Sequence, residues 1–286
     1  MKILILGMPK TGTTALYSKI RNSFKGDINC IFEPKQYDEN DSENVLAKVL
    51  FSDRETDYNS FLEFDKKIII VRDLRDWIIS SLLYGFSYGK KCFRNETLVL
   101  DILRLLRQKE IDPNSVSLLK IFNSVKFGPD TNFEINAHNP LGLLNRFIGF
   151  HNSNEDFFLI KYEDFVDGRL NGLEEYLGFR LDGSSEVGPT LNRVVRTKGY
   201  GNWKDWFTQE DINYFRPIFT PFMERYSYGG DWRVNVDKRI NPEHCSLYAL
   251  RNINEKRNNA GLEYIGFNER GIFNKIKKFL ARIQFQ

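Results

Sequence analysis

The stretch that most constrains the fold is residues 2–20, where an apolar run, a glycine-bounded loop and a helix-like segment follow one another without a gap. The run Lys2-Ile3-Leu4-Ile5-Leu6 is typical of a buried strand. The loop Gly7-Met8-Pro9-Lys10-Thr11-Gly12-Thr13-Thr14 follows, and residues 15–20 have the character of a helix opening. In such a unit the loop amides and the positive end of the helix dipole converge on one point, which suits an anionic ligand.

The composition of this loop strengthens the interpretation. Lys10 adds a full positive charge, and Thr11, Thr13 and Thr14 add hydroxyl donors. The loop is not a Walker A loop, because that pattern requires lysine directly after the second glycine, where this chain has Thr13. An ordinary strand-to-helix turn containing a glycine is the alternative, and the spacing and the run of threonines disfavour it.

Strands and helices alternate along the remainder of the chain. Apolar runs predict further strands at 29–32, 67–71 and 157–160. Helical apolar spacing predicts helices at 45–50, 77–84, 98–106, 170–177 and 212–226. The last of these follows Thr208 and Asp211, which resemble a capping box. This alternation predicts an α/β fold of three layers, with a central parallel sheet, helices on both faces and ligands at the carboxyl ends of the strands.

Composition bounds the class of protein. The 286 residues carry 41 Lys and Arg against 38 Asp and Glu, and this near balance disfavours general nucleic-acid binding. The three cysteines are scattered with no metal-ligand spacing, which favours reduced thiols and a cytoplasmic protein. The first apolar run is too short for a signal peptide, and no stretch approaches transmembrane length. We expect a single domain over residues 1–286.

A second charged segment follows the strand predicted at 67–71. Arg72 comes directly after this strand, in the turn Arg72-Asp73-Leu74-Arg75-Asp76, where its fork of donors is placed to grip a phosphate. Ser80 lies eight residues on, two turns into the following helix, and can face the same anion. An exposed charged turn with a buried serine is the alternative reading.

Two later segments complete the pattern. The loop Arg196-Thr197-Lys198-Gly199-Tyr200-Gly201-Asn202-Trp203-Lys204 combines basic residues with glycines, and Phe207 and Thr208 follow it. Lys161-Tyr162-Glu163-Asp164 stands directly after the strand predicted at 157–160.

Taken in order, the four segments resemble the motifs of sulfotransferases that use 3′-phosphoadenosine 5′-phosphosulfate (PAPS). P-K-T-G-T-T resembles the 5′-phosphosulfate loop, and Arg72 and Ser80 keep the spacing of the 3′-phosphate motif. The late loop is similar to R-K-G-x-x-G-D-W-K-N-x-F-T, with Thr197 for lysine, Lys198 for glycine, Asn202 for aspartate and Asp205 for asparagine. Either Thr197 or Lys198 takes the role of the family lysine.

The resemblance implies a P-loop-type enzyme with PAPS as donor, 3′,5′-bisphosphoadenosine (PAP) as product and no metal. Lys10 would act in catalysis and in donor binding. The other donor-binding residues would be Pro9, Thr11, Gly12, Thr13, Thr14, Arg72, Ser80, Tyr162, Arg196, Thr197, Lys198 and Gly199. Two rival classes remain: a nucleotide or small-molecule kinase with a variant loop, and a non-catalytic nucleotide-binding protein.

Glu33 is the candidate general base. Phenol- and steroid-type sulfotransferases use a histidine before the central strand, but here the region before Lys67 has none, and His138, His151 and His244 lie outside the matched motifs. The segment Phe32-Glu33-Pro34 resembles that of carbohydrate 6-O-sulfotransferases. The chain therefore resembles the glutamate-base carbohydrate enzymes more than the histidine-base cytosolic ones. A surface carboxylate before a turn proline is the alternative.

The acceptor is expected to be a hydroxylated molecule, a carbohydrate or a glycolipid. It should be read by insertions around residues 34–66 and 85–150, where Tyr84, Phe86, Tyr88 and Phe93 either stack on the acceptor or belong to the core.

The C-terminal segment is predicted to be a basic amphipathic helix at about 271–285. Apolar residues recur there at helical spacing, and Lys275, Lys277, Lys278 and Arg282 occupy the remainder. It either packs on the domain or rests on an anionic membrane surface, which would bring the enzyme to a lipid-linked acceptor.

Overall fold

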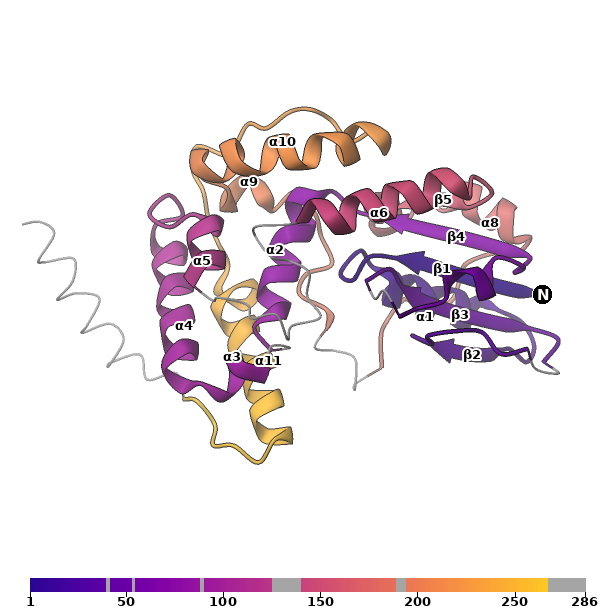
Figure 1. Cartoon of the computed structure of the whole chain (residues 1–286), viewed down its shortest axis with the longest axis horizontal. Coiled ribbons are helices and arrows are strands. Elements are labelled where there is room, and N and C mark those ends of the chain that lie inside the picture. Colours follow the sequence, from indigo (N-terminus) through magenta and orange to yellow (C-terminus); the bar gives the residue numbers. More distant parts are fainter. Residues whose placement is uncertain (40–41, 53–54, 88–89, 125–139, 189–193, 267–286) are drawn as a thin grey trace, which may run out of the picture.

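A parallel sheet stands at the centre of the computed structural model, which describes residues 1–39, 42–52, 55–87, 90–124, 140–188 and 194–266. Within these ranges the sheet has five strands, in the order β2-β3-β1-β4-β5, and every neighbouring pair is parallel (Figure 1). The strands are β1 (Lys2–Gly7), β2 (Asn29–Phe32), β3 (Val45–Leu50), β4 (Lys66–Val71) and β5 (Phe158–Lys161). Their carboxyl ends therefore share one edge, with β1 in the middle.

Alternation along the strands produces the three layers. Ile3 and Ile5 of β1 face one hydrophobic cluster, which includes residues of α1 (Thr13–Ser23) and α8 (Asn171–Leu177). Leu4 and Leu6 face a second cluster with α2 (Leu74–Gly85), α6 (Pro140–Ser153) and α10 (Gln209–Arg225). Because successive side chains of a strand point to opposite faces, this division confirms the predicted three-layer α/β fold.

A group of helices extends the molecule away from the sheet. These are α3 (Lys90–Arg94), α4 (Glu96–Ile111), α5 (Leu118–Ser124) and α11 (Ser246–Asn259). They lie on the far side of α2 from the sheet, and α10 crosses above α2 and α6 (Figure 1). Their buried residues belong to the same cluster as Leu4 and Leu6, so one continuous core connects the two parts. The shorter helical turns are η1 (Tyr58–Phe61), α7 (Tyr162–Val166), α9 (Trp203–Trp206) and η3 (Pro242–His244).

The helix predicted at 45–50 is wrong, because this segment is β3. It pairs with β1 on one side and β2 on the other, and all but Leu50 of its residues are buried. Six residues of the pattern V-L-A-K-V-L fit a helical face and a strand covered on both sides equally well. Pairing with the neighbouring strands decides between them. The predicted insertion at 34–66 therefore contains a strand of the central sheet.

The other expected elements are present with shifted ends, and the predicted capping box is confirmed. Thr208 and Asp211 exchange side-chain and backbone hydrogen bonds at the start of α10. The helices α5, α6 and α11 were not expected from the sequence. His138, Tyr88 and the helix predicted at 271–285 lie outside the described residues, and the role of the insertions in acceptor binding stays a prediction.

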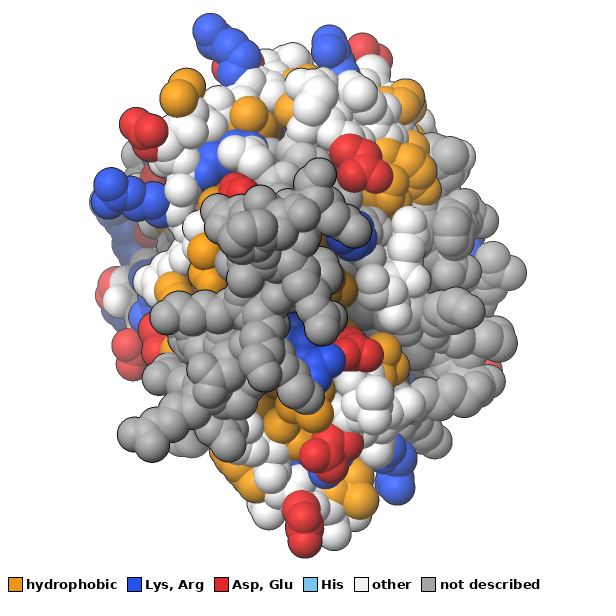
Figure 2. Space-filling view, turned by 90° about the vertical axis from the view of Figure 1, so that its left-hand side faces the viewer, with side chains coloured by type: hydrophobic (Ala, Val, Ile, Leu, Met, Phe, Trp, Pro, Cys, Tyr) orange, Lys and Arg blue, Asp and Glu red, His pale blue; other side chains and the backbone are white. Residues whose placement is uncertain are grey.

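Surface and length features complete the description. On the face shown in Figure 2, acidic and basic side chains are interspersed rather than gathered by sign. None of the helices within the described ranges combines the length and the apolar character needed to cross a membrane.

Candidate functional site

The loop between β1 and α1 has the conformation of an anion cradle. Gly12 is the N-cap of α1 and adopts a left-handed backbone, with φ of 97°. A Cβ atom at Gly12 would lie 2.5 Å from Cδ2 of Tyr162, so both the backbone and the space require glycine. Lys10 is left-handed as well, with φ of 71°, an unusual conformation for a residue with a side chain. The free amides at the start of α1 therefore face the carboxyl edge of the sheet.

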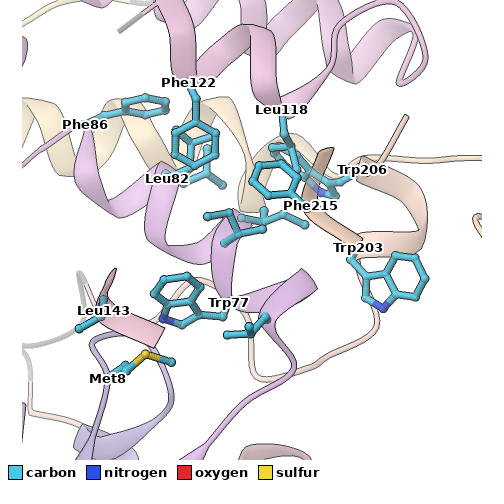
Figure 3. Packing of buried hydrophobic residues seen from close by; sticks show 14 of the residues in the cluster. Met8, Trp77, Leu82, Phe86, Leu118, Phe122, Leu143, Trp203, Trp206 and Phe215 are labelled. Atoms are coloured by element: carbon cyan, nitrogen blue, oxygen red, sulfur yellow. The ribbon is translucent and has the colours of Figure 1, made fainter. Parts of the chain in front are cut away.

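Contacts from α2 and from the loop itself hold this conformation. Thr11 is fully buried, and its hydroxyl donates to the Met8 carbonyl at 2.7 Å. The indole Nε1 of Trp77 donates to the Pro9 carbonyl at 2.7 Å, and Arg72 Nη1 donates to the Lys10 carbonyl at 3.2 Å. Figure 3 shows Trp77 beside Met8, at the end of the hydrophobic cluster nearest the loop. The loop is thus fixed before any ligand binds.

A pocket of about 690 Å³ opens above this loop. It is lined by the carboxyl ends of the strands, by α2 and by the segments 185–187 and 194–198. The predicted site residues in its lining are Pro9, Lys10, Gly12, Thr13, Thr14, Glu33, Arg72, Ser80, Tyr162, Arg196, Thr197 and Lys198. The structure therefore brings together residues that are up to 189 positions apart in the chain, between Pro9 and Lys198.

Two buried arginines meet at one side of the pocket. Arg72, at the end of β4, is 4% exposed, and Arg196 is 6% exposed. Nε of Arg72 and both Nε and Nη2 of Arg196 have no hydrogen-bond partner among the described residues. Burial, together with the neighbouring charge of Arg72, lowers the pKa of Arg196 to about 10. Two buried cations with unpaired N–H groups form a site that a multiply charged anion would satisfy.

Asp76 joins this arginine pair to the late loop. Its fully buried carboxylate accepts from Gly201 N at 2.5 Å and from Trp203 N at 3.1 Å. Burial raises the pKa of Asp76, and the charge of Arg72 opposes that rise. Arg72 Nη2 also donates to the Gly199 carbonyl at 3.4 Å. The first turn of α2 therefore sets the position of the loop that carries Arg196.

Tyr162 lies between Arg72 and the loop before α1. The Arg72 guanidinium carbon lies 4.3 Å from its ring centroid, a cation–π contact. Its hydroxyl donates to the Thr197 carbonyl at 3.4 Å. Burial raises the pKa of Tyr162, so the hydroxyl stays a donor at neutral pH. Tyr162 therefore lines the pocket, and its role in nucleotide binding stays a prediction.

Lys10 points into the pocket and makes contacts with two of its walls. Its Nζ donates to the Val194 carbonyl at 2.5 Å and lies 4.0 Å from the centroid of the Tyr84 ring. Tyr84 is therefore part of the pocket, whereas Phe86 and Phe93 are buried in the core.

Glu33 stands at the end of β2 and forms an ion pair with Lys48 of β3. Glu33 adopts a left-handed backbone with φ of 55°, and its side chain is 43% exposed, whereas that of Lys48 is 2% exposed. Burial lowers the pKa of Lys48, and the charge of Glu33 opposes this effect. Lys48 Nζ also lies 4.1 Å from the centroid of the Phe32 ring. Glu33 therefore lines the pocket beside a buried cationic neighbour.

Several predicted residues take other places. Thr11 and Gly199 do not line the pocket, because Thr11 braces the loop and Gly199 N donates to Thr197 Oγ1 at 3.2 Å. Lys198 belongs to the pocket lining but is exposed, with its Nζ 3.8 Å from a carboxylate oxygen of Glu186. His151 is buried, with its ring stacked on that of Tyr226, and is not a pocket residue.

Sequence reasoning missed Lys48 and Asp76. Lys48 was overlooked because the segment 45–50 was expected to be a helix, although a lysine within an apolar run is itself a signal. Asp76 is part of the segment that was singled out, but its partners lie more than a hundred residues away. In the described part of the chain, no group of three or more His, Cys, Asp or Glu side chains is arranged to hold a metal ion.

Comparison with known proteins adds a distant structural likeness. No protein-family model matches the chain, and no curated protein matches it in sequence. Among solved structures, it is similar to mouse sulfotransferase SULT7A1 complexed with PAP, at 16% identity and a TM-score of 0.46. The similarity covers 78% of this chain and 84% of the mouse chain. At this level of overlap, the likeness does not identify the function of this chain.

Proposed function

We propose that this chain is a PAPS-dependent sulfotransferase, which moves a sulfuryl group from PAPS to an acceptor hydroxyl by in-line displacement. The observation that carries the proposal is the pair of arginines, which line the same pocket as the lysine-bearing loop and keep buried N–H groups without a hydrogen-bond partner among the described residues. A donor nucleotide with two separated anionic groups matches these two subsites. The residues of the two subsites lie far apart in the chain. Ordinary surface charges are therefore a poor explanation for their meeting in one pocket.

The residues at the ends of β1 and β4 would bind the donor nucleotide. Arg72 and Arg196, together with Ser80 of α2, would hold the 3′-phosphate. Lys10 and the amides at the start of α1 would hold the 5′-phosphosulfate. A phosphate between the arginines would receive their unpaired donors, which are costly to leave buried without a partner.

The catalytic side would be supplied by Lys10 and Glu33. Glu33 would accept the proton of the acceptor hydroxyl while the oxygen attacks sulfur. Lys10 would stabilise the charge that develops on the leaving phosphate oxygen, an interaction that is stronger in the transition state than in the ground state. Both residues have left-handed backbones, and strained backbone is concentrated at functional sites.

The acceptor in this proposal is a molecule with a free hydroxyl group. A carbohydrate or glycolipid is the expectation from Phe32-Glu33-Pro34.

We also propose a cytoplasmic location and a contact of the C-terminal segment with membranes. Flotation of the whole chain with anionic vesicles, compared with a chain truncated after Gly271, tests the membrane contact.

Thermal stability with matched nucleotides tests the donor assignment. PAP and AMP differ only in the 3′-phosphate, so PAP should raise the melting temperature far more than AMP does. Arg72→Ala and Arg196→Ala should each remove this difference. Arg180→Ala is the matched control, because its exposed side chain pairs only with Glu174 at 3.6 Å in the described structure.

Other outcomes assign the chain elsewhere. Stabilisation by ATP with Mg²⁺ but not by PAP would indicate a kinase. Stabilisation by PAP without transfer from labelled PAPS to any hydroxylated acceptor would indicate a non-catalytic nucleotide-binding protein.

A further inference from the structure

A half-buried tyrosine outside the predicted motifs, Tyr228, is connected to the arginine side of the pocket through one carboxylate. Tyr228 lies three residues after the end of α10, and its hydroxyl donates to Oε2 of Glu163 at 2.8 Å. The other oxygen of this carboxylate, Oε1, accepts from Asp73 N at 3.0 Å. Glu163 is only 9% exposed, so each oxygen of a buried carboxylate has a donor.

The same carboxylate spans the point where β4 and β5 separate. The two strands pair as far as Val71 and Lys161. Beyond this pair Arg72 begins the turn and Tyr162 begins α7, and the Arg72 guanidinium carbon lies 4.3 Å from the Tyr162 ring centroid. By accepting from Asp73 N, the residue after Tyr162 holds the residue after Arg72. This bond therefore fixes the backbones of the two pocket residues relative to each other.

The segment that carries Tyr228 is held against the same two turns. Ser227 has a left-handed backbone with φ of 52°, and its carbonyl accepts from Lys161 Nζ at 3.0 Å. The same ammonium group lies 4.7 Å from the centroid of the Tyr228 ring. Further along the segment, the Asp231 carbonyl accepts from Arg75 Nη1. A strained residue with contacts on both sides indicates that the position of the Tyr228 hydroxyl is tightly specified.

Two donors hold the Glu163 carboxylate in place. Burial raises the pKa of Glu163, and the hydrogen bonds from Asp73 N and the Tyr228 hydroxyl oppose this rise. Burial also raises the pKa of Tyr228, so its hydroxyl stays a donor at neutral pH. Without this hydroxyl one carboxylate oxygen would lose its donor, and the side chain would gain by turning toward water, away from Asp73 N.

We infer that Tyr228 is a positioning residue for the 3′-phosphate site, because its hydroxyl fixes the carboxylate that holds Arg72 beside Tyr162. Neither Tyr228 nor Glu163 belongs to the described lining of the pocket, so both act through Arg72 and not on the ligand. A guanidinium binds phosphate well only when its fork of donors is correctly oriented. This inference rests on the proposed function, in which Arg72 binds the phosphate that distinguishes PAP from AMP. In a purely structural role, the contact would stabilise the chain without affecting the choice between these nucleotides.

The ratio of the affinities for PAP and AMP separates the two roles. Both affinities are measured by calorimetric titration of the parent chain and of Tyr228→Phe, which removes only the hydroxyl. We expect the ratio to fall by about fivefold, because a misplaced guanidinium loses part of its charge-assisted hydrogen bonding to the 3′-phosphate. AMP lacks this phosphate, so its affinity should hardly change. Tyr226→Phe is the matched control, because the Tyr226 hydroxyl lies 3.1 Å from Nδ1 of His151 and neither residue is in the described pocket lining, and it should leave the ratio unchanged.

Variants of Glu163 test the route of the effect. Glu163→Ala should lower the ratio at least as much as Tyr228→Phe, and the double variant should lower it no further than Glu163→Ala alone, since Tyr228 acts through Glu163. Glu163→Gln should retain most of the ratio, because its amide accepts from Asp73 N through oxygen and donates to the Tyr228 hydroxyl through nitrogen.

The outcomes that contradict the inference differ from those that contradict the proposed function. An unchanged ratio in Tyr228→Phe or in Glu163→Ala would overturn the inference, even with a lowered melting temperature, and so would additive losses in the double variant. A general loss of stability cancels from the ratio, because both nucleotides are titrated into the same folded protein. Failure of the parent chain to bind PAP more tightly than AMP would instead reject the proposed function.

Discussion

At the scale of single residues, the two candidate catalytic side chains share an unusual backbone. Lys10 and Glu33 are two of the three described non-glycine residues with positive φ, the third being Ser227. A left-handed conformation costs an L-residue about 1–2 kcal/mol, which the surrounding contacts must offset. At Lys10 these contacts come from Arg72 and Trp77, which hold the carbonyls of Lys10 and Pro9.

Two substitutions at Lys10 separate strain from chemistry. Lys10→Ala and Lys10→Gly should both nearly abolish sulfuryl transfer, because each removes the ammonium group that faces the developing charge. Lys10→Gly should be the more stable of the two by about 1 kcal/mol, since glycine adopts φ of 71° without a Cβ clash. Urea unfolding of both variants measures this difference. Equal stability would show that the backbone at position 10 relaxes in the variants.

The Glu33–Lys48 pair links activity to stability. Glu33→Gln should lower turnover about a hundredfold through loss of the base. It should also lower the free energy of unfolding at pH 7 by on the order of 1–2 kcal/mol, because Lys48 stays buried without a carboxylate while solvent already screens part of the pair.

The pH dependence of that deficit has a definite sign. Burial already lowers the pKa of Lys48 from 10.5, and loss of Glu33 lowers it further. Between this lowered pKa and 10.5 the unfolded chain binds more protons than the folded one, so the stability of Glu33→Gln should rise with pH relative to the parent. Adding Lys48→Met to Glu33→Gln should remove the pH-dependent part. A deficit that does not change from pH 7 to 10 would contradict the ion pair.

At the scale of elements, the turn from β4 into α2 organises the side of the pocket that holds the two arginines. Arg72 ends the strand, and Asp73 caps α2 by accepting from Arg75 N at 2.9 Å. The Arg75 guanidinium carbon lies 4.1 Å from the Trp203 ring centroid and 5.1 Å from that of Trp232. One short turn therefore carries a buried arginine of the pocket and the contacts that place the late loop.

Asp76 is the residue of this turn whose loss should move the late loop. Asp76→Ala leaves the amides of Gly201 and Trp203 buried without their acceptor, at a cost of about 1–3 kcal/mol. It should also weaken PAP binding, because the segment that bears Arg196 is no longer held against α2. Asp76→Asn keeps one acceptor oxygen and should recover part of both losses. Calorimetric titration with PAP measures the affinity, and an unchanged affinity in Asp76→Ala would remove Asp76 from the positioning of the site.

A buried lysine near the end of helix α4 should make the stability of the chain depend on pH. Lys109 is fully buried and donates to the carbonyls of Pro113, at 3.0 Å, and Val116, at 2.5 Å. Burial lowers its pKa to about 8 from 10.5. The folded chain thus binds fewer protons than the unfolded chain between these values, and the free energy of unfolding should rise with pH across that window, by up to about 3 kcal/mol. Urea unfolding at pH 7 and 10 should show this rise in the parent chain relative to Lys109→Met. Equal pH responses would place the pKa of Lys109 near its ordinary value.

At the scale of the whole molecule, one hydrophobic cluster connects the sheet to the outer helices. Leu4 of β1, Trp77 of α2, Phe215 of α10 and Ile253 of α11 belong to the same cluster. Figure 3 shows how Trp77 and Phe215 lie within it, between the loop near Met8 and the outer helices. A continuous core predicts cooperative behaviour of the chain.

We therefore expect one unfolding transition. Scanning calorimetry should show a single peak, and PAP should shift the whole peak to higher temperature. Two peaks, of which PAP moves only one, would show that the helices beyond α2 form a separate domain. This measurement also tests the expected single domain over residues 1–286.

The sequence by itself determined the local parts of the site. Residues 2–20 specify a strand, a tight loop and a helix because glycine, lysine and threonine act within a few residues of one another. Arg72 and Ser80 follow from the end of a strand and the period of a helix in the same way. The α/β fold followed from the alternation of such units, since few topologies accommodate it.

The tertiary structure alone decided which of these parts meet. The segment 45–50 became β3 because β1 and β2 supply its hydrogen-bond partners, and only this pairing brings Lys48 to Glu33. Arg196 meets Arg72 because Asp76 binds amides 125 and 127 residues further along the chain. Hydrogen bonds and burial between distant segments carry no local signature, since each partner looks like an ordinary polar or apolar residue in its own stretch. The pocket likewise exists only once the strands stand in the order β2-β3-β1-β4-β5, because this order brings Glu33, Lys10 and Arg72 to one edge of the sheet.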